Sequence, residues 1–116
     1  MDVAAALAEL REVAPHVRAA VLLDDSGEAI ASTVAQPAEL GRAARELIVA
    51  ADELRRSQGR TLVRLRVLTR DGGVYAARGE RGWLAAAVAT AAAETLVFYD
   101  LDNCLRALAQ TAGATA

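Results

Sequence analysis

The stretch GRTLVRLRVLTRDGGVYAARGERGWLAAAVA, residues 59–89, contains three strand-like runs separated by two glycine-containing turns. The first run, 61–70, alternates between two faces. One face carries Val63, Leu65 and Val67, and the other carries Leu62, Arg64, Arg66 and Leu68. Turns at 71–73 and 79–82 lead into the second and third runs. The stretch therefore predicts a three-stranded antiparallel meander. Its last run is apolar on both faces, which predicts a central strand covered by helices on each side.

A second hairpin is predicted upstream, in VLLDDSGEAIAS, residues 21–32. Asp24, Asp25, Ser26 and Gly27 separate the strand-like runs 17–23 and 28–34, and these residue types favour a tight turn. Two adjacent acids at a hairpin tip point in different directions and stay hydrated, whereas general acid–base pairs face each other across a pocket. A calcium loop needs further oxygen ligands at alternating positions. We interpret the two carboxylates as part of a turn.

Three further segments have apolar residues at helical spacing. They run from Asp2 to about Ala14, from Pro37 to about Ser57, and from about Ala91 or Glu94 to Gln110. Pro37 suits the first position of the middle helix, and Gly59 is expected to end it. The element order α-β-β-α-β-β-β-α predicts one α+β domain over residues 1–116, with a five-stranded antiparallel sheet and helices on both faces.

The middle helix has more apolar surface than a single contact needs. Its main stripe consists of Leu40, Ala44, Leu47, Ala51 and Leu54, with Ile48 widening it and Ala43 and Ala50 flanking it. One interpretation is an alanine-rich helix lying on a sheet. The other is that one shoulder packs on the sheet and the other meets a second helix from a partner chain, because alanine permits close helix–helix approach.

Composition and single residues argue against several function classes. A net charge of -2 with 3% aromatic residues argues against nucleic-acid binding. Cys104 is the only cysteine and lies on the apolar stripe of the last helix, while His16 is the only histidine and follows a proline. We therefore expect no catalytic site, no metal and no cofactor.

Targeting signals are also missing from the sequence. Asp2 stands where a secretory signal would carry positive charge, and the longest apolar run, 83–93, is shorter than a membrane-spanning helix. We expect a cytoplasmic protein without membrane insertion.

One segment is strongly basic. Eight arginines lie between residues 55 and 81, against only Asp71 and Glu80. Arg64 and Arg66 are two residues apart and share one face of the predicted strand. They could keep a sheet edge soluble or pair with acids on the long helix. Alternatively, they could form a guanidinium patch that docks an acidic partner.

The element order, the hairpin tip at 21–32, the long alanine-rich helix and the meander at 59–89 together resemble the Roadblock family, which is named for dynein-associated light chains. The resemblance spans nearly the whole chain. In prokaryotes this family includes small stand-alone proteins that partner Ras-like small GTPases, such as the gliding-motility pair of a GTPase and its activating protein. The resemblance implies a non-enzymatic regulator or scaffold.

The resemblance also implies a homodimer in which third strands pair edge to edge and long helices pack side by side. The pairing edge would run from Thr61 to Thr69, including Val63, Leu65 and Val67, and the helix contact would use Ala43, Leu47, Ala50 and Leu54. Candidate contacts to the GTPase are Arg42, Arg45, Glu46 and Asp52, joined by Arg64 and Arg66 from the basic segment. The family supplies no motif that would make any of these an arginine finger.

An alternative from another class is a profilin-like sensor that holds a small molecule between helix and sheet. A tight polar-lined cavity would favour the sensor, and a large apolar dimer face would favour the regulator.

Overall fold

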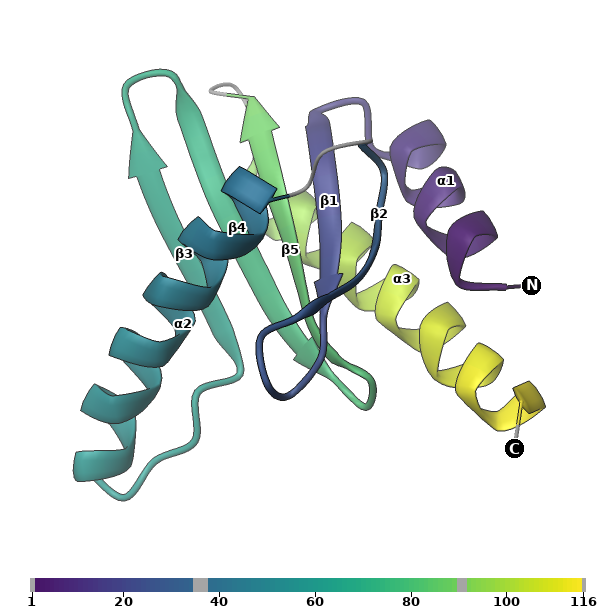
Figure 1. Ribbon diagram of the computed structural model, residues 1–116. Coiled ribbons are helices and arrows are strands. Elements are labelled where there is room, and N and C mark those ends of the chain that lie inside the picture. The colour runs from purple at the N-terminus through teal and green to yellow at the C-terminus, as the bar shows by residue number, and fades with distance from the viewer. Residues whose placement is uncertain (1, 35–37, 90–91, 116) are drawn as a thin grey trace.

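The computed structural model describes residues 2–34, 38–89 and 92–115, with side chains described up to Gln110. The elements follow the predicted order (Figure 1). They are α1 (Val3–Val13), β1 (Val17–Leu23), β2 (Ala29–Ser32), α2 (Ala38–Ser57), β3 (Arg64–Thr69), β4 (Gly72–Gly79), β5 (Gly82–Ala89) and α3 (Glu94–Thr115). The predicted α+β fold with a five-stranded antiparallel sheet is confirmed.

The strands lie in the order β2-β1-β5-β4-β3, so β5 is central and β2 and β3 form the edges. The prediction that the last run of the meander is a buried central strand is confirmed. Along β5, Leu84, Ala86 and Val88 enter one hydrophobic cluster, and Trp83 and Ala85 enter another on the opposite face. Each face of β5 is therefore covered, as its continuous apolar sequence requires.

The two faces of the sheet are covered unequally. Helices α1 and α3 pack together on one face, and α2 crosses the other, as Figure 1 shows. The larger cluster buries seven leucines, Leu7, Leu10, Leu22, Leu84, Leu101, Leu105 and Leu108. The smaller one joins α2 to the sheet through Ala44 and Ile48, which contact a floor that includes Leu23, Leu62 and Trp83.

The β1–β2 connection is the predicted tight turn. One carboxylate oxygen of Asp24 accepts hydrogen bonds from the Ser26 hydroxyl at 2.7 Å and from the backbone N–H groups of Ser26 and Glu28, each at 2.9 Å. Gly27 has φ +89°, a conformation that glycine adopts without strain. The hydrogen bonds, first of all the one from the Ser26 hydroxyl, lower the pKa of Asp24 below its ordinary value.

Several predicted boundaries and faces are wrong. The strand predicted from Thr61 begins at Arg64, and Leu62, predicted on the arginine face, is buried in the α2 cluster because residues 60–63 precede the ladder. Helix α3 continues to Thr115, past the predicted end at Gln110. The strand predicted over 28–34 spans only 29–32. Pro37 and Ala91, named as possible helix starts, lie outside the described residues.

Only part of the apolar stripe predicted for α2 is buried within the single chain. Gly41, Ala44 and Ile48 are buried, whereas Leu47 is half-buried and Leu54 is exposed. At about 3.6 residues per turn, residues 41, 44 and 48 share one line, and 47 and 54 fall on its flank. The predicted end of the helix is right, because Gly59 adopts φ +70° just beyond Ser57.

Two glycines with positive φ, one at the start of β5 and one after α2, can be compared to test how tightly the backbone is packed at the start of β5. At Gly82 (φ +128°) a Cβ would lie 2.0 Å from the carbonyl oxygen of Leu23, while at Gly59 nothing lies within 4 Å. We expect Gly82→Ala to lower the free energy of unfolding by at least about 3 kcal/mol, or to prevent folding, since the clash is with backbone. Gly59→Ala should cost only about 1 kcal/mol. Urea denaturation compares the two, and equal losses would contradict this account.

Candidate functional site

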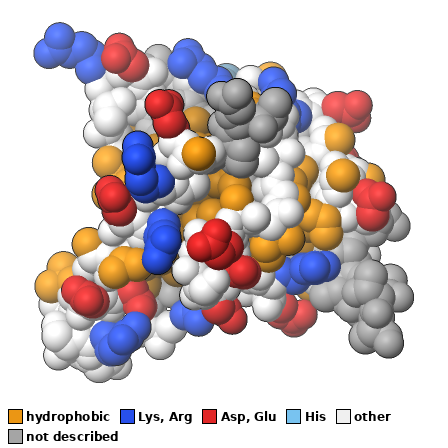
Figure 2. All heavy atoms as spheres, in the orientation of Figure 1, with side chains coloured by type: hydrophobic (Ala, Val, Ile, Leu, Met, Phe, Trp, Pro, Cys, Tyr) orange, Lys and Arg blue, Asp and Glu red, His pale blue; other side chains and the backbone are white. Residues whose placement is uncertain are grey.

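The first part of the candidate site is an apolar flank of α2 that its own chain leaves open. The four residues predicted for the helix contact, Ala43, Leu47, Ala50 and Leu54, share this flank at helical spacing. Ala43 and Ala50 are exposed, Leu47 is half-buried, and Leu54 is 62% exposed. Figure 2 shows hydrophobic side chains at the surface along this side of the molecule. The flank, which we call the α2 flank, is therefore accessible to a partner.

The second part is the free edge of β3. Among the described strands, β3 is paired only with β4. The backbone N–H of Arg78 donates to the carbonyl of Val63 at 2.9 Å, so the alternation of an antiparallel ladder turns the backbone groups of Arg64, Arg66 and Leu68 away from β4. These residues carry the unpaired donors and acceptors of the sheet edge.

Apolar side chains accompany this edge. Val63 is 57% exposed and Leu68 is 60% exposed, while Leu65 and Val67 are half-buried and Thr61 is exposed. Leu65 packs in the same cluster as Ala51 of α2, so the edge and the helix lie side by side. The β3 edge and α2, which carry the two sets of residues predicted for the dimer contact, are thus joined through one hydrophobic cluster.

The arginines of β3 point to the opposite face of the sheet. Arg64 binds Asp102 and Arg66 binds Glu94, each at 2.5 Å, and the Arg64 guanidinium lies 5.0 Å from the centre of the Phe98 ring. Both acids belong to α3. The interpretation that the arginines pair with acids on the long middle helix, α2, is therefore wrong. The role of Arg64 and Arg66 as partner contacts stays a prediction.

The remaining predicted contacts lie elsewhere on α2. Arg42, Arg45 and Glu46 are exposed, and Asp52 is half-buried and forms an ion pair with Arg56 one turn later. Arg45 and Asp52 line the cleft beside the β1–β2 hairpin, whereas Glu46 neighbours Ala43 and Ala50 of the α2 flank on the helix surface. Two further candidate contacts to the GTPase, Arg64 and Arg66, lie within the predicted pairing edge from Thr61 to Thr69.

A cleft that sequence reasoning missed lies between α2, the β1–β2 turn and the β4–β5 hairpin. It has a volume of about 420 Å³. Its lining comprises Leu23, Asp24, Asp25, Ser26, Gly27, Arg45, Ile48, Val49, Asp52, Glu53, Arg56, Arg78 and Trp83. Figure 2 shows basic and acidic side chains facing one another between α2 and the hairpin. No local motif predicts this cleft, because its walls come from three separate parts of the chain.

The single cysteine does not have the properties of a nucleophile. Burial, and secondarily the charge of Glu9, raises the pKa of Cys104 to about 11, and its thiol donates a 3.6 Å hydrogen bond to the carbonyl of Ala6. The thiol is therefore protonated near neutral pH.

Over residues 2–34, 38–89 and 92–115, no three His, Cys, Asp or Glu side chains gather as a metal site would require. None of the helices in these ranges combines the length and apolarity needed to cross a membrane.

The fold closely matches several solved structures. A Roadblock/LC7 domain from Streptomyces avermitilis is 17% identical, with a TM-score of 0.82 over 95% of this chain and 97% of that one. MglB from Myxococcus xanthus is 16% identical, with a TM-score of 0.83 over 98% and 90% of the two chains. An MglB with a tetrameric arrangement is 20% identical, with a TM-score of 0.82 over 98% and 90%.

By sequence alone, the chain matches no protein-family model and no curated protein. At these identities the likeness concerns the fold. It confirms the resemblance to the Roadblock family at that level, over nearly the whole chain.

Proposed function

Because the chain has the fold of Roadblock/LC7 domains and MglB, we propose that it is a homodimeric, non-enzymatic regulator or scaffold of a Ras-like small GTPase. The observation that carries the proposal is the exposed α2 flank beside the open β3 edge. The tetrameric arrangement described for one MglB neighbour supports self-association of this fold.

The β3 edge has the features of a pairing edge. Isolated edges are commonly protected by charged side chains that discourage a second strand. Here the charges of Arg64 and Arg66 are bound to α3, and the exposed side chains that remain nearby include Val63 and Leu68. A second copy can therefore add its own β3 through backbone hydrogen bonds without desolvating a free charge.

A two-fold contact at β3 would bring the α2 flanks together. In such a contact the same patch serves both copies, so small residues such as Ala43 and Ala50 would meet their own counterparts closely. Leu47 and Leu54 would be buried between the helices. The α2 pair would then present a composite surface that includes Arg42 and Glu46, and this is where we place the GTPase.

The dimer is tested with two apolar residues that are already exposed in the single chain. We expect wild-type protein to have twice the 12.1 kDa chain mass by light scattering. Val63→Asp and Leu54→Glu should each weaken the dimer at least about 10-fold, because a carboxylate buried without a partner is costly. Leu65 is unsuitable, since it packs against the α2 cluster within one chain.

The matched control is Val13→Asp on α1, where a valine is 59% exposed outside the proposed contact. Its mass should equal that of wild type. Circular dichroism should show all four proteins folded. A monomeric wild type, or a control that dissociates as readily as the two test variants, would contradict the proposed dimer.

The GTPase is tested with purified Ras-like small GTPases from the source organism. We expect one of them to bind the dimer, and the charge exchange Arg42→Glu with Glu46→Arg to weaken that binding at least about 10-fold. Arg70→Glu, at an exposed turn position after β3, should leave binding unchanged. Calorimetry gives the affinities, and a nucleotide-hydrolysis assay separates a regulator from a scaffold. Failure of every such GTPase to bind the folded dimer would contradict the proposed partner.

A further inference from the structure

The cleft between α2 and the β1–β2 hairpin lies outside the proposed dimer contact, and two of its lining residues, Arg45 and Asp52, are also candidate contacts to the GTPase. We propose that this cleft binds a small molecule that carries one negative charge on an apolar, aromatic body. Two guanidinium groups from different elements would hold the charge, and an indole with aliphatic neighbours would hold the body.

The first guanidinium belongs to Arg45. Its side chain lies directly against the hairpin glycine, because a Cβ added at Gly27 would come within 2.8 Å of the Arg45 Cδ and 2.9 Å of its Nε. The hairpin tip therefore restricts the arginine stem, and less side-chain entropy remains to be lost when a ligand binds.

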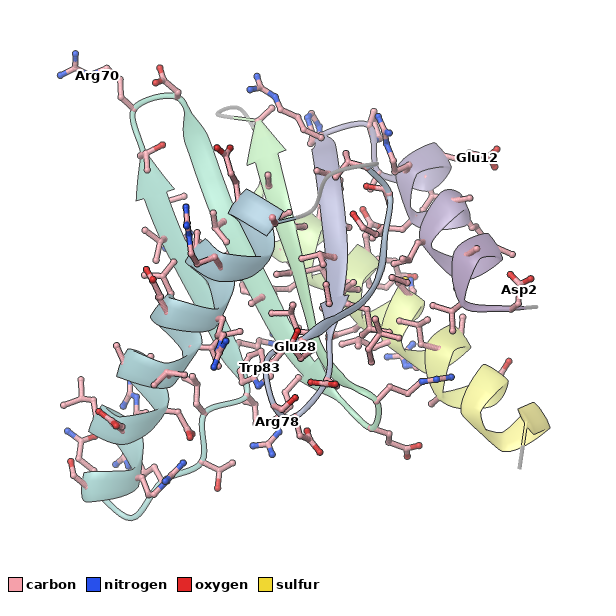
Figure 3. All side chains as sticks on the ribbon, in the orientation of Figure 1. Asp2, Glu12, Glu28, Arg70, Arg78 and Trp83 are labelled. Atoms are coloured by element: carbon pink, nitrogen blue, oxygen red, sulfur yellow. The ribbon has the colours of Figure 1, made fainter. Side chains whose placement is uncertain are left out.

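The second guanidinium belongs to Arg78, which lies beside the floor of the cleft. Arg78 of β4 is the register partner of Trp83 of β5, and Figure 3 shows the two side chains close together near the hairpin tip. Arg78 shares its face of the sheet with Ala76, which packs under α2. Its guanidinium is therefore placed at the same opening as that of Arg45.

Part of the other charge around the cleft is already engaged within the chain. Asp52 is paired with Arg56, and the Asp24 carboxylate accepts the hydrogen bonds of its own turn. In the described parts of the chain, Arg45 and Arg78 are in no ion pair. They can therefore make the charge-assisted hydrogen bonds that a carboxylate or sulfonate offers.

The apolar part of the lining fits an aromatic body. Trp83 is 8% exposed and forms the floor with Leu23 and Ile48, and Val49 adds an aliphatic wall. A volume of about 420 Å³ lies within the range of small-molecule sites. The exposed carboxylates of Asp25 and Glu53 at the same opening would repel a second negative charge, which favours a monoanion over a polyphosphate.

The cleft and the proposed dimer contact lie on opposite flanks of α2. Residues 45, 49, 52 and 56 line the cleft, whereas 43, 47, 50 and 54 form the α2 flank. The buried stripe that includes Ala44 and Ile48 separates them. Ligand binding is therefore expected in the dimer and in a dissociated chain alike, so its test is separate from that of the proposed function.

The test uses Trp83, the only tryptophan of the chain, as the reporter. The probe is 1-anilinonaphthalene-8-sulfonate, a monoanion with an aromatic body, and its neutral twin is N-phenyl-1-naphthylamine, which lacks the sulfonate. We expect the sulfonate to quench Trp83 emission saturably, with one site per chain, and to bind at least about 5-fold more tightly than the neutral twin.

Three glutamine variants locate the charge contact. Arg45→Gln and Arg78→Gln should each weaken sulfonate binding at least about 5-fold and leave the neutral twin unchanged. The matched control Arg70→Gln, on the turn after β3, should bind like wild type. The proposal is overturned if Trp83 is not quenched, if the neutral twin binds as tightly as the sulfonate, or if both cleft variants bind like wild type. Repeating the titration with Leu54→Glu should give the wild-type affinity, and a lost site there would overturn the separation of cleft and dimer.

Discussion

The unequal covering of the two sheet faces is the constraint on which the other features depend. A five-stranded sheet needs apolar cover on both sides. Helices α1 and α3 supply it on one face with a leucine-rich layer, whereas α2 crosses the other and buries only Gly41, Ala44 and Ile48. A helix seated on so narrow a stripe keeps two accessible flanks. One flank carries the residues proposed for the dimer contact, and the other forms a wall of the cleft.

The ion pairs between β3 and α3 lie on the face of the sheet that α1 and α3 cover. Exposed pairs of this kind contribute little to stability. Their main consequence is where they hold the two arginine side chains. By binding Asp102 and Glu94, the two β3 arginines lie toward α3. The exposed part of the edge near α2 is then left to uncharged side chains such as Val63. This arrangement explains how a segment with eight arginines can still offer a strand edge for pairing.

The parts of the fold that could be predicted from the sequence are those with a local sequence pattern. Alternation and glycine turns predicted the meander, and Asp24 through Gly27 predicted the β1–β2 turn. The part of the α2 stripe that packs on its own sheet could not be predicted, since several apolar stripes overlap on that helix and only tertiary packing selects one. The ion-pair partners of the β3 arginines lie 28 and 38 residues away, beyond any local pattern. The cleft was missed for the same reason, because Arg45, Arg78 and Trp83 meet only in the fold.

The account's central claim is that the β3 edge is completed by a second copy of the chain, and amide-resolved hydrogen exchange tests it most directly. The amides of Leu65 and Val67 face β4 and should be protected at every protein concentration. The amides of Arg64, Arg66 and Leu68 face outward, so they should be protected at high concentration and should exchange quickly on dilution below the dissociation constant. Fast exchange of these three amides at concentrations where light scattering finds a dimer would contradict the account.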